Sequence, residues 1–341
     1  MKNITVLGID LAKDVFQLHG INEYGKKILG KKVKRAELPS LIGNLPSCKI
    51  VMEACGSSNY WSRKFISYGH DVTQISPQHV KPFVQGNKND KNDARAIVIA
   101  SQQDGMPTVP VKSIEQQDIQ MNHRYRDSLV HDRTALANRI RGYLREMGIF
   151  LAKGLSRIRK EVPLIVEDAM NDLTDDMRAI IASCHKKVLE LDKEIERYTR
   201  KIEHFSENNE VCKRLMQLSG VGPMIASIVY ATVGDPLHFK NGRHFAAYLG
   251  LVPKEHSSGG RQCLMSISKR GNSYIRSLLI HGGRAVVKSV DNKSDYLSCW
   301  VQRIKKERGY NKASVAVANK NARHMWAIMA YADKYVNRMG A

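Results

Sequence analysis

The sequence lacks the features that would place the protein in a membrane or outside the cell. Its first residues, Met1-Lys2-Asn3, lead directly into a strand-like run and show no signal-peptide pattern. No apolar stretch approaches the roughly 18 residues that a membrane-spanning helix needs. We therefore expect a cytoplasmic protein with no membrane partner.

Cysteine is present, but not in patterns that bind zinc or form disulfide frameworks. The chain has 6 cysteines, and they show neither C-x-x-C spacing nor a Cys/His quartet. Zinc and disulfides are therefore not expected, and buried free thiols are the simplest interpretation. The positions concerned are Cys48, Cys55, Cys184, Cys212, Cys263 and Cys299.

Acidic residues are scarce relative to basic ones. The chain carries 54 Lys and Arg against 33 Asp and Glu, a formal net charge of +21. Such a surplus repels itself unless a polyanion neutralises it, and nucleic acid is the obvious partner. With 341 residues and 43% hydrophobic content, the chain can bury a sizeable core. Two or three folded units of roughly 100 to 150 residues are expected.

The first hundred residues alternate between strand and helix patterns. Three β-rich runs come first, with a turn at Asn22-Glu23-Tyr24-Gly25, and then helices alternate with two further strands. The order β-β-β-α-β-α-β-α is that of the ribonuclease H fold, in which the first and fourth strands lie side by side. The expected strands are residues 4–10, 15–21, 27–33, 49–52 and 71–75.

Two of these strands end in an acid. Asp10 closes the first strand and Glu53 follows the fourth, so the fold would place the two carboxylates next to each other. A strand-end turn residue is the usual explanation for one such acid, but it does not explain both. Converging carboxylates are what Mg²⁺ needs when it acts on a phosphodiester, which predicts a metal-dependent enzyme acting on nucleic acid.

A second acidic pair opens a helix that reaches about residue 103. Asp90 and Asp93 lie in the run Asn87-Lys88-Asn89-Asp90-Lys91-Asn92-Asp93. Their i, i+3 spacing puts both carboxylates on one helical face, where both could approach a pair of metal ions. The structural alternative is that they cap the helix N-terminus and interact with its dipole.

Long helices are expected between about residues 114 and 210. The first helix is dense in arginine, which suits phosphate or folded RNA, although a solvated helix face is the commoner reason for such charge. The arginines that we interpret as nucleic-acid-binding are Arg124, Arg126, Arg133, Arg139, Arg141 and Arg145.

The second long helix carries a heptad seam. Apolar residues recur every three or four positions, so the helix should pack lengthwise against another helix. Self-association is the preferred interpretation, and an intramolecular hairpin with the preceding basic helix is the alternative. The seam consists of Ile181, Cys184, Val188, Leu191, Ile195, Tyr198, Ile202 and Phe205.

The third part of the chain contains a glycine-rich turn in the run 215–226 that resembles a helix-hairpin-helix element. The backbone N–H groups around Gly220 and Gly222 could face a phosphate. A turn between two packed helices with no ligand would give the same pattern.

A serine-glycine loop follows, with Ser257, Ser258, Gly259 and Gly260. A serine here could attack a phosphate whose developing charge is stabilised by nearby cations. From the chemistry alone a plain linker is the better interpretation, and His256 cannot be assigned as a base. The cations near this loop in sequence are Lys254, Arg261, Lys269 and Arg270.

Taken in order, these motifs resemble the DEDD transposases of bacterial insertion sequences, which are relatives of the pilin-gene invertases. The resemblance covers nearly the whole chain. It is carried by Gly8-Ile9-Asp10-Leu11-Ala12-Lys13, Met52-Glu53-Ala54-Cys55-Gly56, Asn87-Lys88-Asn89-Asp90-Lys91-Asn92-Asp93-Ala94-Arg95, Gly220-Val221-Gly222-Pro223, Gly250-Leu251-Val252-Pro253, Ser257-Ser258-Gly259-Gly260 and Ser268-Lys269-Arg270-Gly271-Asn272.

The resemblance implies an α/β plus α-helical recombinase in three parts. These are a RuvC-like, RNase H-like DEDD domain over residues 1–112, a basic helix and coiled coil over 113–209, and a mostly helical transposase domain over 210–341. Asp10, Glu53, Asp90 and Asp93 would then bind Mg²⁺.

The resemblance also reverses the linker interpretation of the serine loop. Ser258 becomes the nucleophile that is joined transiently to a DNA phosphate, with Ser257 as the fallback. Both domains would be needed at one scissile phosphate. The implied partners are donor DNA, target DNA, a noncoding guide RNA and further copies of the chain in a dimer or tetramer, in a bacterial cytoplasm.

Two other classes of function remain open at this point. A RuvC-like nuclease or junction resolvase would share the carboxylates and the basic surface but would form no serine adduct. A non-catalytic nucleic-acid-binding protein would keep the basic helices without any metal-dependent strand breakage, and the four acids argue against it.

Overall fold

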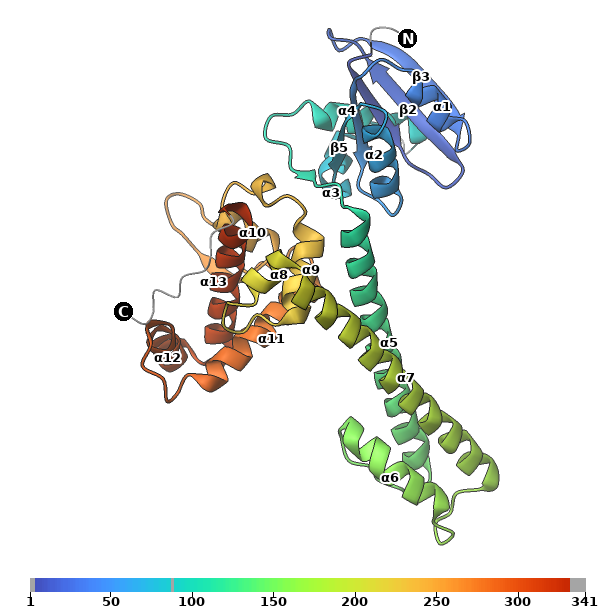
Figure 1. Ribbon diagram of the computed structural model, residues 1–341, viewed down its shortest axis with the longest axis vertical. Coiled ribbons are helices and arrows are strands. Elements are labelled where there is room, and N and C mark those ends of the chain that lie inside the picture. The colour runs from blue at the N-terminus through green and yellow to red at the C-terminus, as the bar shows by residue number, and fades with distance from the viewer. Residues whose placement is uncertain (1–3, 87–88, 332–341) are drawn as a thin grey trace. The chain divides into compact units, whose positions relative to one another are not determined.

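The computed structural model describes residues 4–86 and 89–331 (Figure 1). The chain divides into two compact units. Unit 1 consists of Met1–Gln116 and Val233–His238, and unit 2 consists of Gln117–Thr232 and Phe239–Ala341. Within the described ranges, no helix combines the length and the apolar character needed to cross a bilayer.

Unit 1 is built on one mixed sheet whose strand order is β3-β2-β1-β4-β5-β6. The order of its first five strands and intervening helices is the one expected from the sequence, whereas the short sixth strand was not expected. The strands are β1 (Val6–Asp10), β2 (Val15–Ile21), β3 (Lys27–Lys34), β4 (Lys49–Glu53), β5 (Asp71–Ile75) and β6 (Thr108–Val109).

The first and fourth strands lie side by side at the centre of this sheet. β1 pairs antiparallel with β2 and parallel with β4, in a register that sets Ile9 opposite Met52. The expected adjacency of these strands is therefore confirmed. The β2–β3 hairpin closes as the sequence indicates, since the Asn22 side chain accepts hydrogen bonds from the backbone N–H groups of Tyr24 and Lys26.

The two faces of the sheet are covered by different helices. On one face, Leu7, Ile9, Ile50 and Met52 are buried in a cluster with residues of α1 (Leu38–Gly43) and α2 (Ser58–Ile66). On the other face, Val51 and Ile75 are buried with residues of α3 (Pro77–Val80) and α4 (Asp90–Ser101). A single-turn 3₁₀ helix, Lys81–Phe83, follows α3 directly.

Helix α4 comes unusually close to the central strand at Gly8. A Cβ atom at this position would lie 2.5 Å from Val98 Cγ2 and 2.7 Å from the carbonyl oxygen of Ala94. The missing side chain is therefore what lets the helix backbone approach the sheet. Since strand residues alternate between faces, Gly8 and Asp10 both lie on the α4 side.

We predict that Gly8→Ala pushes α4 away from the sheet and destabilises unit 1. The added methyl group meets a backbone oxygen that cannot swing aside, so the expected loss is about 1–3 kcal/mol of unfolding free energy. Urea denaturation followed by circular dichroism measures this loss. Gly43→Ala is the matched control, because the nearest atoms to its Cβ lie 3.9 Å away; equal stability of the two variants would contradict the prediction.

Unit 2 is almost entirely helical, with one two-stranded sheet formed by β7 (Pro253–Glu255) and β8 (Leu264–Ile267). A one-turn 3₁₀ helix, Pro236–His238, lies in unit 1 between α9 and α10. The helices are α5 (Ile114–Glu146), α6 (Leu155–Glu167), α7 (Asp175–Asn208), α8 (Glu210–Leu215), α9 (Pro223–Val233), α10 (Gly242–Tyr248), α11 (Ser273–Ser289), α12 (Tyr296–Arg308) and α13 (Tyr310–Tyr331).

The boundary expected between residues 209 and 210 does not separate two compact units. The reason is that the long helices share contacts with the C-terminal helices. Ser206 near the end of α7 donates to the carbonyl oxygen of Pro223 at 3.0 Å, and His123 of α5 bonds to Ser227 and Tyr274. The expected boundary at 112 lies close to the end of unit 1 at Gln116.

The heptad seam of α7 is covered within the same chain. Ile181 and Val188 are buried with Ile140 of α5 and Ile158 of α6, and Tyr125 of α5 packs edge-on against Tyr198. The intramolecular hairpin, which was the alternative interpretation, is thus the arrangement found, whereas self-association, the preferred interpretation, stays a prediction. The heptad periodicity predicts that α7 packs against another helix, but it does not indicate whether that helix belongs to the same chain.

All six cysteines are free thiols, as expected. Their burial was predicted incorrectly, because Cys55, Cys263 and Cys299 are exposed. Cys48 and Cys212 are buried, and burial raises the pKa of the Cys48 thiol to about 11, so that it stays protonated.

Candidate functional site

The first two acids of the expected site end neighbouring parallel strands. Asp10 is the last residue of β1 and Glu53 the last of β4. The Ile9–Met52 register places them at the same level of the sheet. Because Gly8 faces α4 and Val51 is buried beneath it, the alternation of strand residues puts both acids on that face. Both are partly buried.

The other two acids occupy the first turn of α4. The cap of this helix is Asn89, whose side-chain oxygen accepts a hydrogen bond from the backbone N–H of Asn92 at 2.9 Å. Capping by Asp90 or Asp93 therefore does not explain the pair, although both still benefit from the helix dipole. Asn87 and Lys88 of the same motif lie outside the described residues.

The start of α4 lies over the sheet row that contains Asp10. Asp10 is opposite Gln17 of β2, which is in turn opposite Lys32 of β3. Lys32 Nζ reaches from this row to Asp90 Oδ2 at 3.2 Å. His19 of β2 lies opposite Gly8 of β1. Its pKa is lowered by burial and by the positive charges of Lys27 and Arg95.

The carboxylates do not form a finished metal site as the side chains stand. Among the residues that the structure describes, no group of three or more His, Cys, Asp or Glu side chains is arranged to hold a metal ion. Only oxygen donors are present in the acidic set, and these are the ligands that suit Mg²⁺. The structure thus brings the four acids to one face and one end of the sheet without joining them in a cluster.

The serine loop forms the tip of the β7–β8 hairpin. Ser258 and Arg261 exchange backbone hydrogen bonds of 3.4 and 3.0 Å, and Gly259 and Gly260 have φ angles of 56° and 77°. Two consecutive residues with positive φ define a type I′ turn, which glycine adopts without strain. The loop is therefore a defined hairpin and not a plain linker.

The two serines at this tip differ in whether their hydroxyl groups form hydrogen bonds. Ser257 Oγ donates to Glu255 Oε1 at 2.5 Å, and this bond, together with one from Gln262, lowers the pKa of Glu255. Within the described chain, the Ser258 hydroxyl makes no hydrogen bond. Of the two hydroxyl groups, that of Ser258 is therefore the one that no intramolecular hydrogen bond engages among the described residues.

The four cations expected beside the serine are all exposed: Lys254, Arg261, Lys269 and Arg270. Across the described ranges, none of them forms an ion pair. Lys269 has a φ of 54°, which is uncommon for a residue other than glycine. The nearby His256 is exposed and bonds through its backbone N–H to Cys263, so nothing marks it as a base.

The arginines of α5 divide into two groups. Arg126 donates to Thr199 at 2.7 Å, Arg133 to Asp192 at 2.7 Å, and Arg141 to the carbonyl oxygen of Gly154 at 2.9 Å. Arg126 and Arg133 thus hold α5 against α7, and Arg141 holds α5 to the residue that precedes α6, which is the structural alternative for such charge. The other three, Arg124, Arg139 and Arg145, are exposed. At 100° per residue they lie within a sector of about 120° around the helix axis, so they share one side of α5.

Asp192 joins three helices through two guanidinium groups. It accepts from Arg133 of α5 and, in bidentate fashion, from Arg159 of α6 at 2.7 and 2.8 Å. Burial by itself would raise the pKa of Asp192, but these hydrogen bonds lower it overall. The carboxylate stays charged and ties α6 to the α5–α7 pair.

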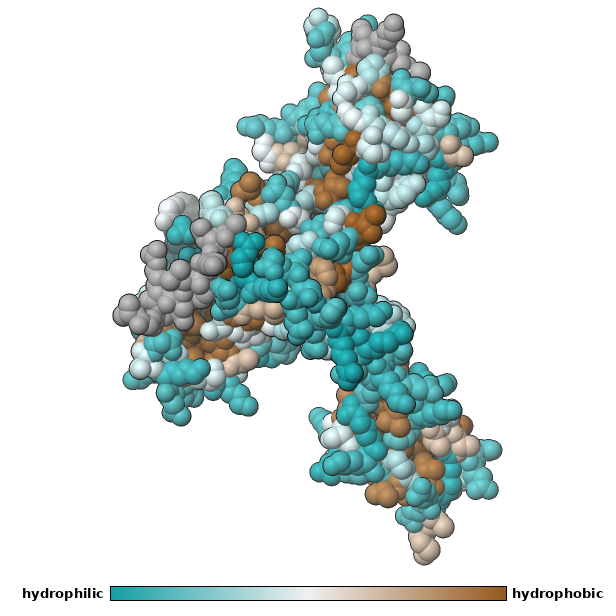
Figure 2. Space-filling model, viewed as in Figure 1, coloured by the Kyte–Doolittle hydropathy of each residue, from teal (hydrophilic) through white to brown (hydrophobic). Residues whose placement is uncertain are grey.

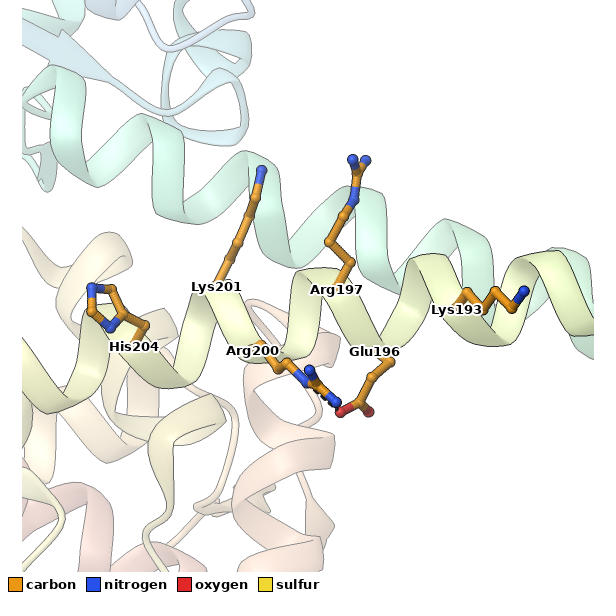
Figure 3. A pocket seen from close by; sticks show the side chains of 6 residues that line it. All are labelled: Lys193, Glu196, Arg197, Arg200, Lys201 and His204. Atoms are coloured by element: carbon orange, nitrogen blue, oxygen red, sulfur yellow. Dashed lines mark hydrogen bonds and ion pairs between the residues drawn. The ribbon is translucent and has the colours of Figure 1, made fainter.

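The α7 helix carries an exposed basic surface that the sequence did not single out. Figure 3 shows Arg200 turned toward Glu196, with an ion pair of 2.8 Å, while Arg197 and Lys201 point to the other side of the helix. Arg197 and Lys201 flank the ring of Tyr198 at 5.0 and 4.9 Å. Figure 2 shows that the visible surface along α5 and α7 is largely hydrophilic.

The glycine-rich turn between α8 and α9 packs against α11. A Cβ atom on Gly220 would lie 2.6 Å from the carbonyl oxygen of Gly282, and one on Gly282 would lie 2.0 Å from that of Gly220. The structure thus gives Gly220 the packing role that was the alternative to phosphate binding. Gly222 has open space around its Cα, so phosphate binding there stays a prediction.

A buried polar chain joins α5, α9 and α11. Ser227 donates to the carbonyl oxygen of Pro223 at 2.6 Å, which leaves its oxygen to accept from His123 Nε2 at 2.9 Å. His123 Nδ1 then accepts from the hydroxyl of Tyr274 at 3.0 Å. Burial lowers the pKa of His123 to about 4 and raises that of Tyr274 to about 12.

We predict that unit 2 loses stability as the pH falls from about 6.5 to 4. In this window the unfolded histidine binds a proton that buried His123 does not, so stability is full above pH 6.5 and declines below it. The shift corresponds to about 3 kcal/mol. Urea unfolding at several pH values measures it, and His123→Gln, which cannot titrate, should show a smaller pH slope. An unchanged slope would refute the assignment.

The comparisons with known proteins agree with this architecture. Residues 212–297 match a family model described as "Transposase IS116/IS110/IS902 family", and residues 7–149 match one described as "Transposase". The chain is 46% identical over 341 residues to the transposase for insertion sequence element IS1111A of Coxiella burnetii, which covers 100% of this chain and 93% of that protein.

Two further relatives extend the comparison. A probable family 20 transposase of Pseudomonas aeruginosa is 43% identical over 332 residues, covering 96% of this chain and 97% of that protein. A pilin gene-inverting protein of Moraxella bovis is 23% identical over 295 residues, covering 81% and 80%. The chain belongs to the IS110/IS116 family of DEDD transposases, enzymes that cleave and rejoin DNA, and the resemblance inferred from its motifs is confirmed.

Proposed function

We propose that this transposase is an RNA-guided DNA recombinase whose unit 1 is an RNase H-like, RuvC-like catalytic domain. The strand order β3-β2-β1-β4-β5 supports the fold assignment. The observation that supports the proposal is the placement of the elements that carry the four acids: Asp10 and Glu53 end adjacent strands, and Asp90 and Asp93 lie in the first turn of the helix that packs on the same face.

Asp10, Glu53, Asp90 and Asp93 are the residues proposed to hold Mg²⁺. The fit is supported by an all-oxygen donor set on one face of the sheet and by the close approach of α4 over Gly8. Bound Mg²⁺ would supply Lewis-acid stabilisation of negative charge on the phosphate oxygens. Lys32, which pairs with Asp90, balances part of the acidic charge.

Ser258 is the proposed nucleophile for strand cleavage. Its Oγ would form a bond to phosphorus as the bond between phosphorus and the leaving deoxyribose oxygen breaks, giving a protein–DNA phosphodiester. The hydroxyl proton passes to solvent and the leaving oxygen takes one from solvent, so no other reactant is consumed. Attack by the freed DNA hydroxyl on this linkage would rejoin a strand and release the serine.

The unpaired cations around the hairpin suit this step. Lys254, Arg261, Lys269 and Arg270 are exposed, and their charges can stabilise the additional negative charge that develops on the phosphate during the attack. The hydrogen bond of Ser257 to Glu255 supports a structural role for that neighbour in the hairpin.

Replacing Asp10 tests the proposed metal site. Asp10→Asn should weaken Mg²⁺ binding in calorimetry and abolish Mg²⁺-dependent cleavage of element-end DNA, because an amide is a weaker ligand than a carboxylate. Asp14→Asn, an exposed acid of the same unit, is the matched control and should behave as the wild type. Wild-type metal affinity and cleavage in the Asp10 variant would refute the proposed role.

Replacing the two serines in turn tests the proposed nucleophile. Ser258→Ala should abolish a covalent protein–DNA adduct that survives denaturing gel electrophoresis, whereas Ser257→Ala should retain it. An adduct that persists in Ser258→Ala contradicts the assignment. Cleaved DNA without any adduct in the wild-type protein would point instead to a RuvC-like nuclease or junction resolvase.

A guide RNA and self-association complete the proposal. The exposed arginines of α5 (Arg124, Arg139 and Arg145), together with Gly222, are offered as nucleic-acid contacts. Sequencing of the RNA that co-purifies with the protein should give one discrete transcript that flanks the element. Bulk cellular RNA would contradict guidance, and the mass of the protein–RNA complex in solution gives the number of copies, expected to be a dimer or tetramer.

A further inference from the structure

A basic groove runs between α12, α13 and the base of the serine hairpin. It has a volume of about 690 Å³ and is defined here by Trp300, Arg303, Arg308, Lys312, Lys320 and Arg323. All of these residues lie in unit 2, as do Pro253 and Ile267, which line the same groove from β7 and β8. The groove does not coincide with the candidate metal site or with the serine tip.

Most charges of this groove have no acidic partner among residues 4–86 and 89–331. Glu307 is the single acid among its lining residues. Over the part of the chain that the structure describes, Arg303, Arg308, Lys312 and Arg323 make no ion pair. Lys305 of α12, which does not line the groove, is by contrast paired with Asp291 at 2.7 Å. An open row of unpaired cations is the electrostatic footprint of a polyanion.

The floor of the groove combines an aromatic ring with a partly desolvated lysine. Lys320 Nζ lies 4.5 Å from the ring centroid of Trp300 and 5.3 Å from that of Tyr296. Burial and the neighbouring Arg323 lower the pKa of Lys320, and a phosphate placed beside it would favour its charged form. Positive charges along a backbone path with an aromatic platform are the usual elements of a nucleic-acid site.

The groove leads to the serine hairpin along the protein chain itself. Asn319 of α13 donates to the carbonyl oxygen of Leu251 at 3.2 Å and so ties the groove wall to the segment that enters β7. Ser258 follows Pro253 by five residues, which is about 16 Å at 3.3 Å per strand residue. That length corresponds to about five steps of 3.4 Å along a DNA strand.

We propose that this basic groove binds the phosphodiester backbone of the DNA strand that Ser258 attacks. The proposal rests on the proposed function, since it takes Ser258 as the nucleophile. Its position favours DNA over the guide RNA, because the groove is continuous with the element that presents the serine. It fixes the strand a few nucleotides from the reacting phosphate and thereby positions that phosphate.

The test measures binding of fluorescein-labelled element-end DNA to the full-length protein by fluorescence anisotropy at several salt concentrations. The double variant R303Q/R323Q removes two phosphate contacts. Its affinity for DNA should fall, and the slope of log K against log salt should become less steep by about 1.8. Its affinity for a hairpin RNA of unrelated sequence should remain unchanged.

The matched control is R284Q/K306Q, which removes the same charge from exposed positions of α11 and α12 outside the groove. It should leave the DNA affinity and the salt slope close to wild type. Circular dichroism of both variants shows whether they fold. If one arginine pair prevents folding, R308Q/K312Q serves as a second variant, with the same expected change in slope.

A further readout comes from Trp300. Binding of the same DNA should quench tryptophan fluorescence, and Trp300→Phe should remove this quenching while Trp326→Phe retains it. Quenching that persists in Trp300→Phe would overturn the proposal.

Three binding results would also overturn it. The first is that R303Q/R323Q binds DNA as tightly as the control variant does. The second is that it loses affinity for RNA alone, and the third is that it loses affinity for DNA and RNA equally. Each is distinguishable from failure of the proposed function. If Ser258 forms the adduct but the groove variants bind DNA like the wild type, only the groove proposal is refuted. If the groove variants lose DNA affinity but the wild-type protein forms no adduct, the proposed serine chemistry is refuted.

Discussion

The close approach of α4 to β1 over Gly8 is the constraint on which the acidic end of the sheet depends. Asp10 and Glu53 are placed by strand pairing, which needs no helix. Asp90 and Asp93 reach the same face because the helix backbone lies almost on the strand, with no room for a single methyl group. A larger separation would leave two acids at the strand ends and two on a distant helix.

Much of unit 1 could be predicted from the sequence. Alternating apolar residues gave the strands, turn residues such as Asn22 and Gly25 gave the hairpin, and the order of elements gave the neighbours of β1. The sequence could not show that Lys32 pairs with Asp90, because this contact joins residues 58 positions apart. Nor could it show that Asn89, and not an aspartate, caps α4.

Unit 2 was harder to predict, because its important contacts join residues far apart in the sequence. The arginines of α5 look alike in the sequence, yet Arg126 and Arg133 face the partner helix while Arg124 faces solvent. The same holds for His123, whose partners lie 104 and 151 positions away. Helical periodicity could have separated the arginine faces, but only once the packing side of α5 was known.

The exposure of the β7–β8 hairpin has a consequence for the proposed chemistry of Ser258. A two-stranded ribbon with no other strands beside it is marginally stable in water, and nearly all of its residues are exposed. The hydroxyl at its tip is therefore held by few contacts before a substrate is bound. Ordering it costs conformational entropy that only a correctly seated DNA strand can offset. If Ser258 is the nucleophile, as proposed, a DNA strand that is not correctly seated would leave its hydroxyl unaligned, and cleavage at other sites would be slow.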